Sequence, residues 1–260
     1  MFYSIKLNYK VTFITIFLIL INFLNIYING ITKTREEYLI SIYKDKKLLA
    51  LTFDDGPTKY TNQILDFLDS TDTKATFFLL GEQAEKYPDL VLREYNSKHS
   101  VCIHSYTHKF FTKISKEEVI EQIEKTKSVI QNITQSTPLY IRVPYGIIDD
   151  SVKETLKEEN VENVLWNVDS LDWKFKNKDQ VVEYIKQNTT GNDIILMHDI
   201  LQSSVDAAKE IIIYYKDLGY EFVTIDEFLE IKNIVKNTKW LVLIYNCYII
   251  LMVINYETQI

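Results

Sequence analysis

Between residues 47 and 235, short runs of β-forming residues alternate with segments of helical periodicity, and this alternation limits the fold more than any other feature of the chain. The expected strands are Leu48–Phe53, Ala75–Leu80, Ser100–Ile103, Leu139–Val143, Asn163–Trp166, Asp193–Met197 and Glu221–Val223. The expected helices are Asn62–Leu68, Lys116–Ile130, Ser151–Lys157, Lys178–Gln187, Ser203–Tyr215 and Ile225–Ile231. Because parallel strands are joined by crossover helices, the pattern predicts an α/β fold, either a barrel or a doubly wound sheet.

Residues that can carry chemistry fall where the expected strands end. They are Asp54 and Asp55, His104, Arg142, the stretch 169–173, and His198. In an α/β fold the ends of parallel strands meet on one face, where the loops build the active site. We therefore expect these separate segments to form one pocket.

Composition limits the class of protein. The chain has 260 residues, of which 47% are hydrophobic, so it is long and apolar enough for one large domain. A formal net charge of -7 and the lack of a basic run argue against nucleic acid as a partner. Two cysteines, Cys102 and Cys247, are too few for a disulfide framework, and we interpret both as buried thiols.

The two ends of the chain are apolar. Residues 11–28 carry no charge and are about long enough to cross ~30 Å of hydrocarbon, so residues 1–30 are predicted to be an N-terminal transmembrane anchor. A cleaved signal peptide is the alternative, but no A-x-A-like site follows. We expect a short linker over 31–46 and the catalytic domain over 47–235. Residues 240–256 form a second apolar segment, either a further span or an interfacial helix.

Two short motifs suggest a metal site. Asp54 and Asp55 are followed at once by glycine and proline, which would turn both carboxylates into one site or would simply form a solvated turn. His104 and His108 are four residues apart and can bind one divalent ion. Two histidines and one carboxylate leave open positions, as in catalytic zinc sites, and leave the second aspartate free to act as a base. We interpret the nearby His99 as a surface residue.

Five motifs then point to a family. TFDDGP, HSYTH, RVPYG, DSLDW and LMH occur in this order and at about the spacing of the five motifs of the NodB-homology polysaccharide deacetylases, carbohydrate esterase family 4. The chain resembles this family over residues 47–231. The resemblance implies an irregular (β/α)7-type barrel of the NodB-homology type, outside the predicted transmembrane helix.

The resemblance also implies roles for the first two motifs. Asp54 is similar in position to the catalytic base of the family. Asp55, His104 and His108 are similar to the metal ligands. The ion would be Zn²⁺ first, with Co²⁺, Mn²⁺, Ni²⁺ or Fe²⁺ as alternatives for such a donor set.

The other three motifs supply the remaining roles implied by the resemblance. Arg142 resembles the arginine that holds the base, and the backbone N–H of Tyr145 resembles the donor to the oxyanion. His198 resembles the general acid, and Asp172 the aspartate that orients it. The apolar walls around the acetyl methyl group would be formed by Trp173 and Leu196.

The function expected from this resemblance is metal-dependent removal of N-acetyl groups from N-acetylglucosamine in a cell-wall or extracellular polysaccharide: peptidoglycan, poly-N-acetylglucosamine or a chitin-like chain. The catalytic domain would be extracellular and membrane-anchored, or secreted. Three alternatives stay open: an O-acetyl esterase on xylan-like glycans, a small-molecule amidase of the same fold, and an inactive carbohydrate-binding protein. The sequence leaves the oligomeric state open.

Overall fold

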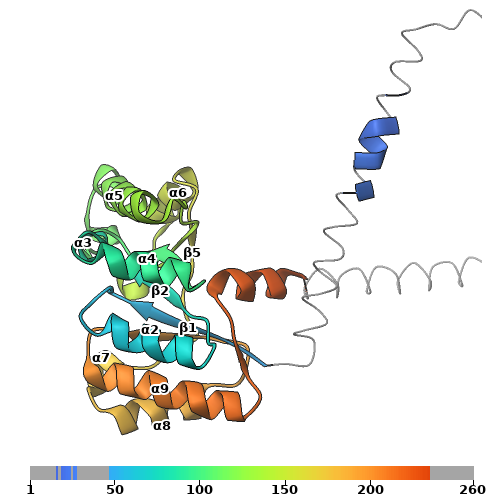
Figure 1. Cartoon of the computed structure of the whole chain (residues 1–260). Helices are drawn as coiled ribbons and strands as arrows, with labels where there is room; N and C mark the ends of the chain where they lie inside the picture. Colours follow the sequence, from blue (N-terminus) through green and yellow to red (C-terminus); the bar gives the residue numbers. More distant parts are fainter. Residues whose placement is uncertain (1–15, 17–18, 25, 28–46, 235–260) are drawn as a thin grey trace, which may run out of the picture. The chain divides into compact units, whose positions relative to one another are not determined.

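A parallel β-sheet forms the centre of the fold (Figure 1). The computed structural model describes residues 16, 19–24, 26–27 and 47–234, and residues 46–230 form one compact unit. In the described part of the chain the sheet has the order β5-β4-β3-β2-β1-β7-β6, and β8 pairs with the start of β1. The strands are β1 (Leu48–Asp54), β2 (Thr76–Leu79), β3 (Ser100–Ile103), β4 (Tyr140–Ile141), β5 (Glu162–Asn163), β6 (Val168–Asp169), β7 (Asp193–His198) and β8 (Glu221–Phe222).

Strand β1 lies in the middle of this sheet and is buried along its whole length. Its sequence, LLALTFD, is nearly continuously apolar, as expected for a parallel strand covered on both faces. Its one internal polar side chain, Thr52, donates a hydrogen bond to the carbonyl of Ile195 at 2.7 Å. The register pairs Asp54 with Phe78 on one side and with His198 on the other, so β1 and β7 end level with each other.

The helices pack in two groups around the sheet. They are α2 (Thr61–Ser70), α3 (Gly81–Lys86), α4 (Pro88–Asn96), α5 (Lys116–Thr134), α6 (Asp150–Glu158), α7 (Asp172–Phe175), α8 (Lys178–Asn188) and α9 (Gln202–Asp217), and residues 225–234 are also helical. Short 3₁₀ helices occupy Phe111–Lys113 (η1) and Pro144–Gly146 (η2). Helices α3, α4 and α6 contact α5, whereas α2 and α8 contact α9 (Figure 1).

Three helices begin with a capping residue that the sequence makes recognisable. The side chains of Ser115, Asp149 and Asn177 accept hydrogen bonds from backbone N–H groups in the first turns of α5, α6 and α8. Each cap satisfies a donor that the helix leaves unpaired. The caps therefore define the residues at which α5, α6 and α8 begin.

The predicted alternation of parallel strands and crossover helices is confirmed. The architecture is a half-barrel, since the path of paired strands runs from an edge at β5 to an edge at β6 among the described residues. Several boundaries differ from expectation: β4 and β5 have only two residues each, and β6, α3, α4 and α7 were not predicted. The short strands and α3 and α7 carry no clear periodic pattern of their own, whereas α4, with nine residues, is as long as α6 and was missed.

The interpretation of His99 as a surface residue is wrong. His99 is 5% exposed and lies directly before β3. Its ring packs edge-on against Phe77, with 5.5 Å between the ring centroids, and its Nδ1 accepts a hydrogen bond from the Ala75 N–H at 3.3 Å. The strand beside it carries the ring into the interior, where an apolar contact and one hydrogen bond hold it. Cys102 is buried, as predicted.

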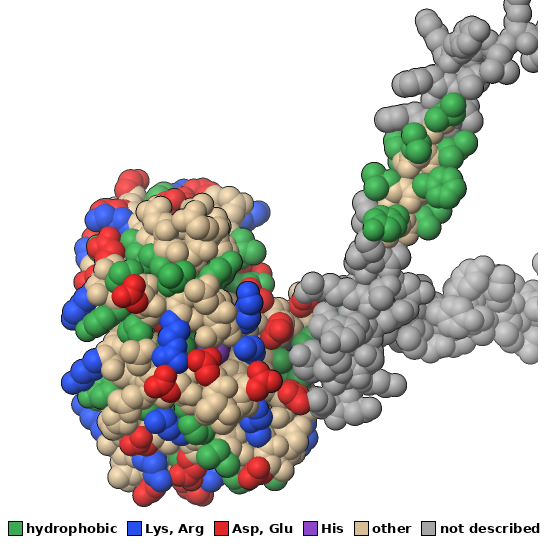
Figure 2. All heavy atoms as spheres, viewed as in Figure 1, with side chains coloured by type: hydrophobic (Ala, Val, Ile, Leu, Met, Phe, Trp, Pro, Cys, Tyr) green, Lys and Arg blue, Asp and Glu red, His purple; other side chains and the backbone are tan. Residues whose placement is uncertain are grey.

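No helix among the described residues is both long and apolar enough to cross a membrane. Of the anchor predicted over 1–30, the structure describes residues 16, 19–24 and 26–27, and the remainder lies outside the described residues. The linker 31–46, the apolar segment 240–256 and Cys247 lie wholly outside them. On the face shown in Figure 2, acidic and basic side chains of the compact unit are interspersed.

Candidate metal centre and active site

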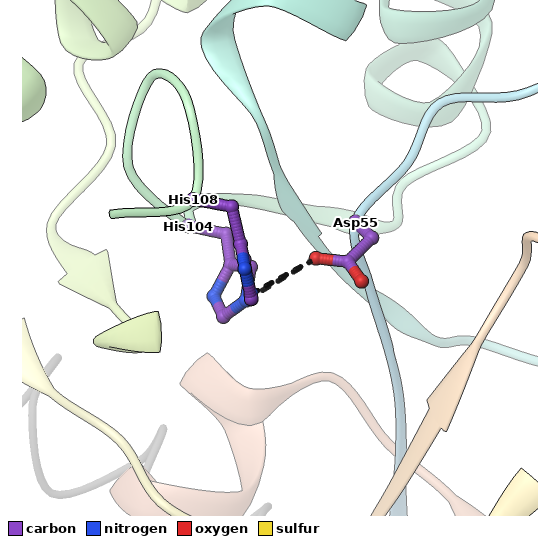
Figure 3. A group of neighbouring side chains, drawn as sticks. All are labelled: Asp55, His104 and His108. Carbon is purple, nitrogen blue, oxygen red and sulfur yellow. Dashed lines mark ion pairs between the residues drawn. The ribbon is translucent and has the colours of Figure 1, made fainter. Parts of the chain in front are cut away.

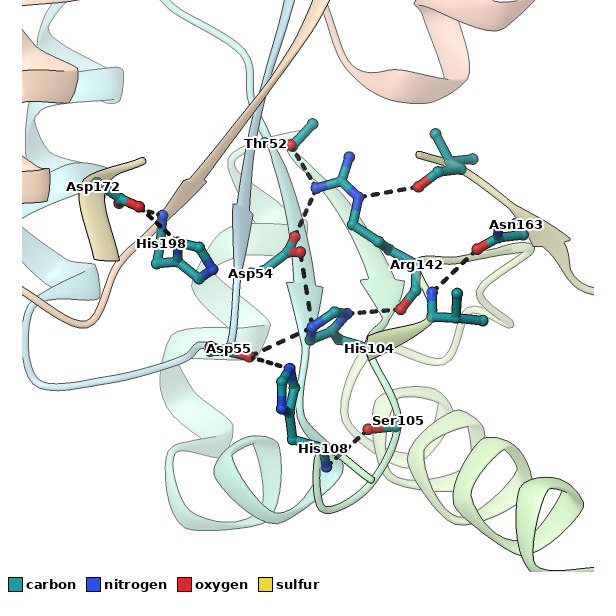
Figure 4. A network of polar contacts seen from close by, with 12 residues as sticks. Thr52, Asp54, Asp55, His104, Ser105, His108, Arg142, Asn163, Asp172 and His198 are labelled. Carbon is teal, nitrogen blue, oxygen red and sulfur yellow. Dashed lines mark hydrogen bonds and ion pairs between the residues drawn. The ribbon is translucent and has the colours of Figure 1, made fainter. Parts of the chain in front are cut away.

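The structure brings the charged and imidazole side chains of the predicted site together where the parallel strands end (Figure 4). Asp54 ends β1, Asp55 follows it, and His104 follows β3, with His108 in the loop beyond. The others are Arg142 directly after β4, Tyr145 in η2, Asp172 and Trp173 in α7, and Leu196 and His198 in β7. Chain segments that are far apart in sequence thus meet at the carboxyl ends of the parallel strands, as the α/β pattern predicts.

Asp55, His104 and His108 form a compact triad (Figure 3). The Oδ1 atom of Asp55 lies 3.5 Å from Nε2 of His104 and 3.4 Å from Nε2 of His108. One ligand atom from each residue lies within 4.8 Å of the other two. Asp55 Oδ1 is buried and has no hydrogen-bond partner. A buried acceptor with no donor is costly, so this arrangement fits a divalent cation between the three side chains.

Two of these three residues adopt backbone conformations that are uncommon for residues other than glycine. Asp55 has φ 72° and His108 has φ 58°, both in the left-handed region. The backbone N–H of His108 donates to the Ser105 hydroxyl at 2.9 Å, which helps to hold this conformation. Such local strain is typical of functional sites, where the surrounding structure fixes an unfavourable geometry.

The tautomer of His104 follows from its partner. Its Nδ1 lies 2.7 Å from the backbone carbonyl of Arg142, which can only accept, so the proton is on Nδ1 and the lone pair of Nε2 faces the triad. Burial lowers the pKa of His104 to about 3, against an opposing effect of the Asp55 charge. The ring is therefore neutral at pH 7 and its Nε2 is free to bind a metal ion.

Asp54 is held by a buried arginine on the side away from the triad. Arg142 Nη1 donates to Asp54 Oδ1 and to the Thr52 hydroxyl, both at 2.7 Å, and its Nε donates to the Val164 carbonyl at 3.0 Å. Asp54 Oδ2 lies 3.8 Å from His104 Nε2. Burial raises the pKa of Asp54, while the charge of Arg142 acts in the opposite direction. The result is a fixed carboxylate that presents one oxygen to the metal site.

His198 forms the other side of the site. Its Nδ1 lies 2.8 Å from Asp172 Oδ1, and its backbone N–H donates to Asp172 Oδ2, also at 2.8 Å. Burial alone would lower the pKa of His198, but the hydrogen bond and charge of Asp172 outweigh it and raise the pKa to about 9. The imidazole is therefore protonated at pH 7, and its Nε2 proton is available for donation.

The three residues predicted for substrate contact differ in exposure. Tyr145 is 48% exposed and Trp173 49% exposed, whereas Leu196 is buried. The Tyr145 ring stacks on Phe110 with 3.5 Å between the centroids and meets the edge of His108 at 4.6 Å. Leu196 precedes His198 by two residues on β7, so both side chains point to the same side of the strand.

Three residues around the site were not predicted from the sequence. Thr52 supports Arg142, Asp199 lies buried next to His198, and Phe110 covers one face of Tyr145. For Asp199 a signal was present, since an acidic residue directly after a buried strand and a histidine is unusual. Thr52 and Phe110 look like ordinary strand and loop residues, and only their contacts distinguish them.

Comparison with known proteins identifies the family. A profile of the polysaccharide deacetylase family matches residues 42–164. A peptidoglycan-N-acetylglucosamine deacetylase of Bacillus cereus is 39% identical over 193 residues, which cover 72% of this chain and 70% of that protein. The chain belongs to the polysaccharide deacetylase family.

Two further members of this family add detail. The peptidoglycan-N-acetylmuramic acid deacetylase PdaC of Bacillus subtilis is 39% identical over 190 residues, but this chain spans only 40% of its length. A solved structure of PdaC superposes with a TM-score of 0.72 at 38% identity and covers 75% of this chain and 96% of the solved chain. A family 4 pseudoenzyme from Bacillus anthracis, 28% identical, has a TM-score of 0.67 and covers 71% of this chain and 66% of its own. Fold and family therefore do not by themselves establish activity.

Proposed function

We propose that this deacetylase removes the acetyl group from N-acetylglucosamine residues of peptidoglycan and releases acetate. One observation carries the proposal: Asp54 lies between an Asp-His-His triad and the protonated His198, with Arg142 behind it. A protein that only binds carbohydrate has no need for a base and an acid on opposite sides of one site. Peptidoglycan is the substrate class named for the Bacillus relatives.

Asp55, His104 and His108 hold one divalent ion in this proposal. Two imidazoles and one carboxylate suit Zn²⁺, and Co²⁺, Mn²⁺, Ni²⁺ and Fe²⁺ are accepted by the same donor set. When bound, the ion lowers the pKa of a water molecule and polarises the acetyl carbonyl. The unpaired Asp55 Oδ1 and the lone pair of His104 Nε2 support this assignment.

Asp54 is the general base of the proposed reaction. Arg142 occupies its Oδ1, so Oδ2 is the atom that accepts the proton of the attacking water. The raised pKa of the buried Asp54 carboxyl brings it closer to neutral pH, which makes it a stronger base than an ordinary aspartate. As water adds to the acetyl carbon, the Tyr145 N–H donates to the new oxyanion.

His198 is the general acid. Asp172 occupies its Nδ1, so Nε2 gives a proton to the sugar nitrogen as the bond between carbon and nitrogen breaks. The products are acetate and a free amino sugar. Trp173 and Leu196 line the space for the acetyl methyl group. Because peptidoglycan lies outside the cell membrane, the domain over 47–235 acts there, held by the apolar segment 11–28.

The test is acetate release by the full-length protein, with and without a chelator, followed by re-addition of Zn²⁺. The substrates are N-acetylglucosamine oligomers, peptidoglycan fragments acetylated only on glucosamine or only on muramic acid, and acetylated xylan. We expect chelator-sensitive release, fastest from acetylated glucosamine. Faster release from xylan would instead identify an O-acetyl esterase, and release from muramic acid alone would move the specificity toward that named for PdaC.

The Asp54→Asn variant separates catalysis from metal binding. We expect at least a ~10²-fold lower kcat with an unchanged Zn²⁺ content, because the amide cannot accept a proton. Asp217→Asn, which changes an exposed aspartate at the end of α9, is the matched control and should behave like the wild type. No acetate release from any substrate by the Zn²⁺-loaded wild type would contradict the proposal and favour a pseudoenzyme.

A further inference from the structure

Asp199 has a buried carboxyl group and is next to His198, the proposed general acid. The proposed reaction does not use this carboxyl group. Asp199 follows His198 on the loop from β7 to α9 and is 0% exposed. Burial raises the pKa of Asp199 to about 7, although its hydrogen bond with Thr61 acts in the opposite direction. Burying a carboxyl group costs free energy, and such a cost is most often found at functional sites.

Two hydrogen bonds connect Asp199 to the loop that follows Asp55 and to the first residue of α2. The Thr61 hydroxyl donates to Asp199 Oδ2, and the Thr58 hydroxyl donates to the Asp199 backbone carbonyl at 2.5 Å. The Thr58 N–H donates to the Thr61 hydroxyl at 2.7 Å. Because Thr61 Oγ1 accepts from Thr58, its own proton points to Asp199. These hydrogen bonds tie the loop after β7 to the loop after β1.

Gly56 lies directly against the same carboxyl. A Cβ atom at Gly56 would be 2.6 Å from Asp199 Oδ1 and 2.7 Å from Oδ2, closer than real Cβ atoms come to any neighbour. A side chain at this position would therefore require either the Asp199 carboxyl or the turn to shift. On its other side, the Gly56 carbonyl accepts a hydrogen bond from the Leu80 N–H at 3.1 Å. The residue after Asp55 is therefore held between β2 and Asp199.

We propose that Asp199 is a positioning residue, which fixes the Asp54–Gly56 turn relative to His198. The pairing of β1 with β7 ends at Asp54 and His198, so beyond this point the two chain segments have no common ladder. Asp199 continues the connection with side-chain hydrogen bonds and a close contact at Gly56. Asp54, the proposed base, and Asp55, the proposed metal ligand, are thereby held in fixed positions relative to His198, the proposed acid. This inference rests on the proposed function for its catalytic consequences.

A four-protein cycle tests the contact: wild type, Gly56→Ala, Asp199→Ala and the double variant, all full-length. Gly56→Ala should lower kcat/KM about 100-fold and weaken Zn²⁺ binding, because the new methyl displaces the turn. Asp199→Ala should lower kcat about tenfold with KM little changed, since the turn loosens while the substrate contacts remain. The double variant should be about tenfold more active than Gly56→Ala, because the space has been freed.

Asp199→Asn is the conservative variant. Its amide oxygen still accepts from Thr61, so kcat should stay within about fivefold of the wild type. The exposed Asp217→Ala is the matched control for loss of an aspartate. A structural role alone would lower thermal stability in Asp199→Ala without changing kcat of the folded protein or its Zn²⁺ affinity.

Two results would overturn the inference: equal losses from Gly56→Ala in both backgrounds, or a wild-type kcat and Zn²⁺ affinity for Asp199→Ala. If Gly56→Ala does not fold, the pair Asp199→Ala and Asp199→Asn still decides. If the wild type releases no acetate, the proposed function fails by itself. The four Zn²⁺ dissociation constants then test the positioning of Asp55, with the same rescue expected in the double variant.

Discussion

Two histidines at the ends of different strands of one sheet, His104 buried and His198 partly buried, have different protonation states. His104 follows β3 and His198 ends β7, and each uses Nδ1 for a hydrogen bond, at 2.7 Å and 2.8 Å. The partner of His104 is a backbone carbonyl, whereas the partner of His198 is the carboxylate of Asp172. The pKa of His104 falls to about 3 through burial, and that of His198 rises to about 9 because Asp172 outweighs burial. The hydrogen-bond partner of Nδ1 therefore determines which histidine is neutral, as the proposed metal ligand must be, and which is protonated, as the proposed acid must be.

The largest effects should come from removing each histidine in turn. His104→Ala should abolish both Zn²⁺ binding and acetate release, because it removes one of three protein ligands. His198→Ala should keep the ion and lower kcat by about 10²- to 10⁴-fold, because only the proton donor is lost. Metal content and kcat, measured on the same samples, check both results. Loss of the ion from His198→Ala would show that the two sides of the site are not separate.

A smaller effect is expected when Asp172 is changed. In the wild type, kcat/KM should fall as the pH rises through about 9, since His198 must be protonated to donate. In Asp172→Asn the attraction of the carboxylate is lost and burial lowers the pKa of His198, so the basic limb should move to lower pH. The full pH profile of both proteins measures the shift.

The same pKa shift predicts the pH dependence of stability. The folded-state pKa of His198 lies above the ordinary value of 6.5, so the pair with Asp172 contributes stability that is fully present below pH 6.5 and is lost as the pH rises to about 9. In Asp172→Asn the loss of stability between pH 6.5 and about 9 should disappear, because burial then holds the pKa of His198 at or below its ordinary value. If the basic limb of the kcat/KM profile is the same in Asp172→Asn as in the wild type, the limb belongs to a group other than His198, and the proposed role of Asp172 is contradicted.

Much of the fold follows from local sequence. Strands β1, β3 and β7 lie where their apolar runs predicted them, and α5 begins directly after Ser115, which the structure identifies as its N-cap. Helix α4 begins with Pro88, a helix start signal that was available in the sequence and was missed. The two residues of β6 carry no local signal and pair with β7 only because the chain returns to it.

The sequence predicted which residues lie at the site but not the protonation states of its two histidines, His104 and His198. The Nδ1 partner of His104 comes from a backbone 38 residues away, and that of His198 from a side chain 26 residues away. Neither partner can be read from the residues around the histidine. The same reason explains the error at His99, whose burial depends on Phe77 from the neighbouring strand.

His99 extends the comparison to a histidine at the opposite end of β3, and its expected effect is the smallest. Burial lowers the pKa of His99 to about 4, below the ordinary value of 6.5. The unfolded chain therefore binds a proton first, so this contribution to stability is fully present above pH 6.5 and is lost as the pH falls to about 4. Between pH 7 and pH 5 the loss should be about 2 kcal/mol.

The His99→Gln variant tests this expectation, since its amide oxygen can accept from the Ala75 N–H. The variant should lose less stability than the wild type between pH 7 and pH 5, as measured by urea unfolding at the two pH values. Because His99 lies away from the metal triad, acetate release at pH 7 should not change. An equal loss of stability in the variant would show that other groups cause the acid sensitivity and that the ring of His99 gains its proton without unfolding.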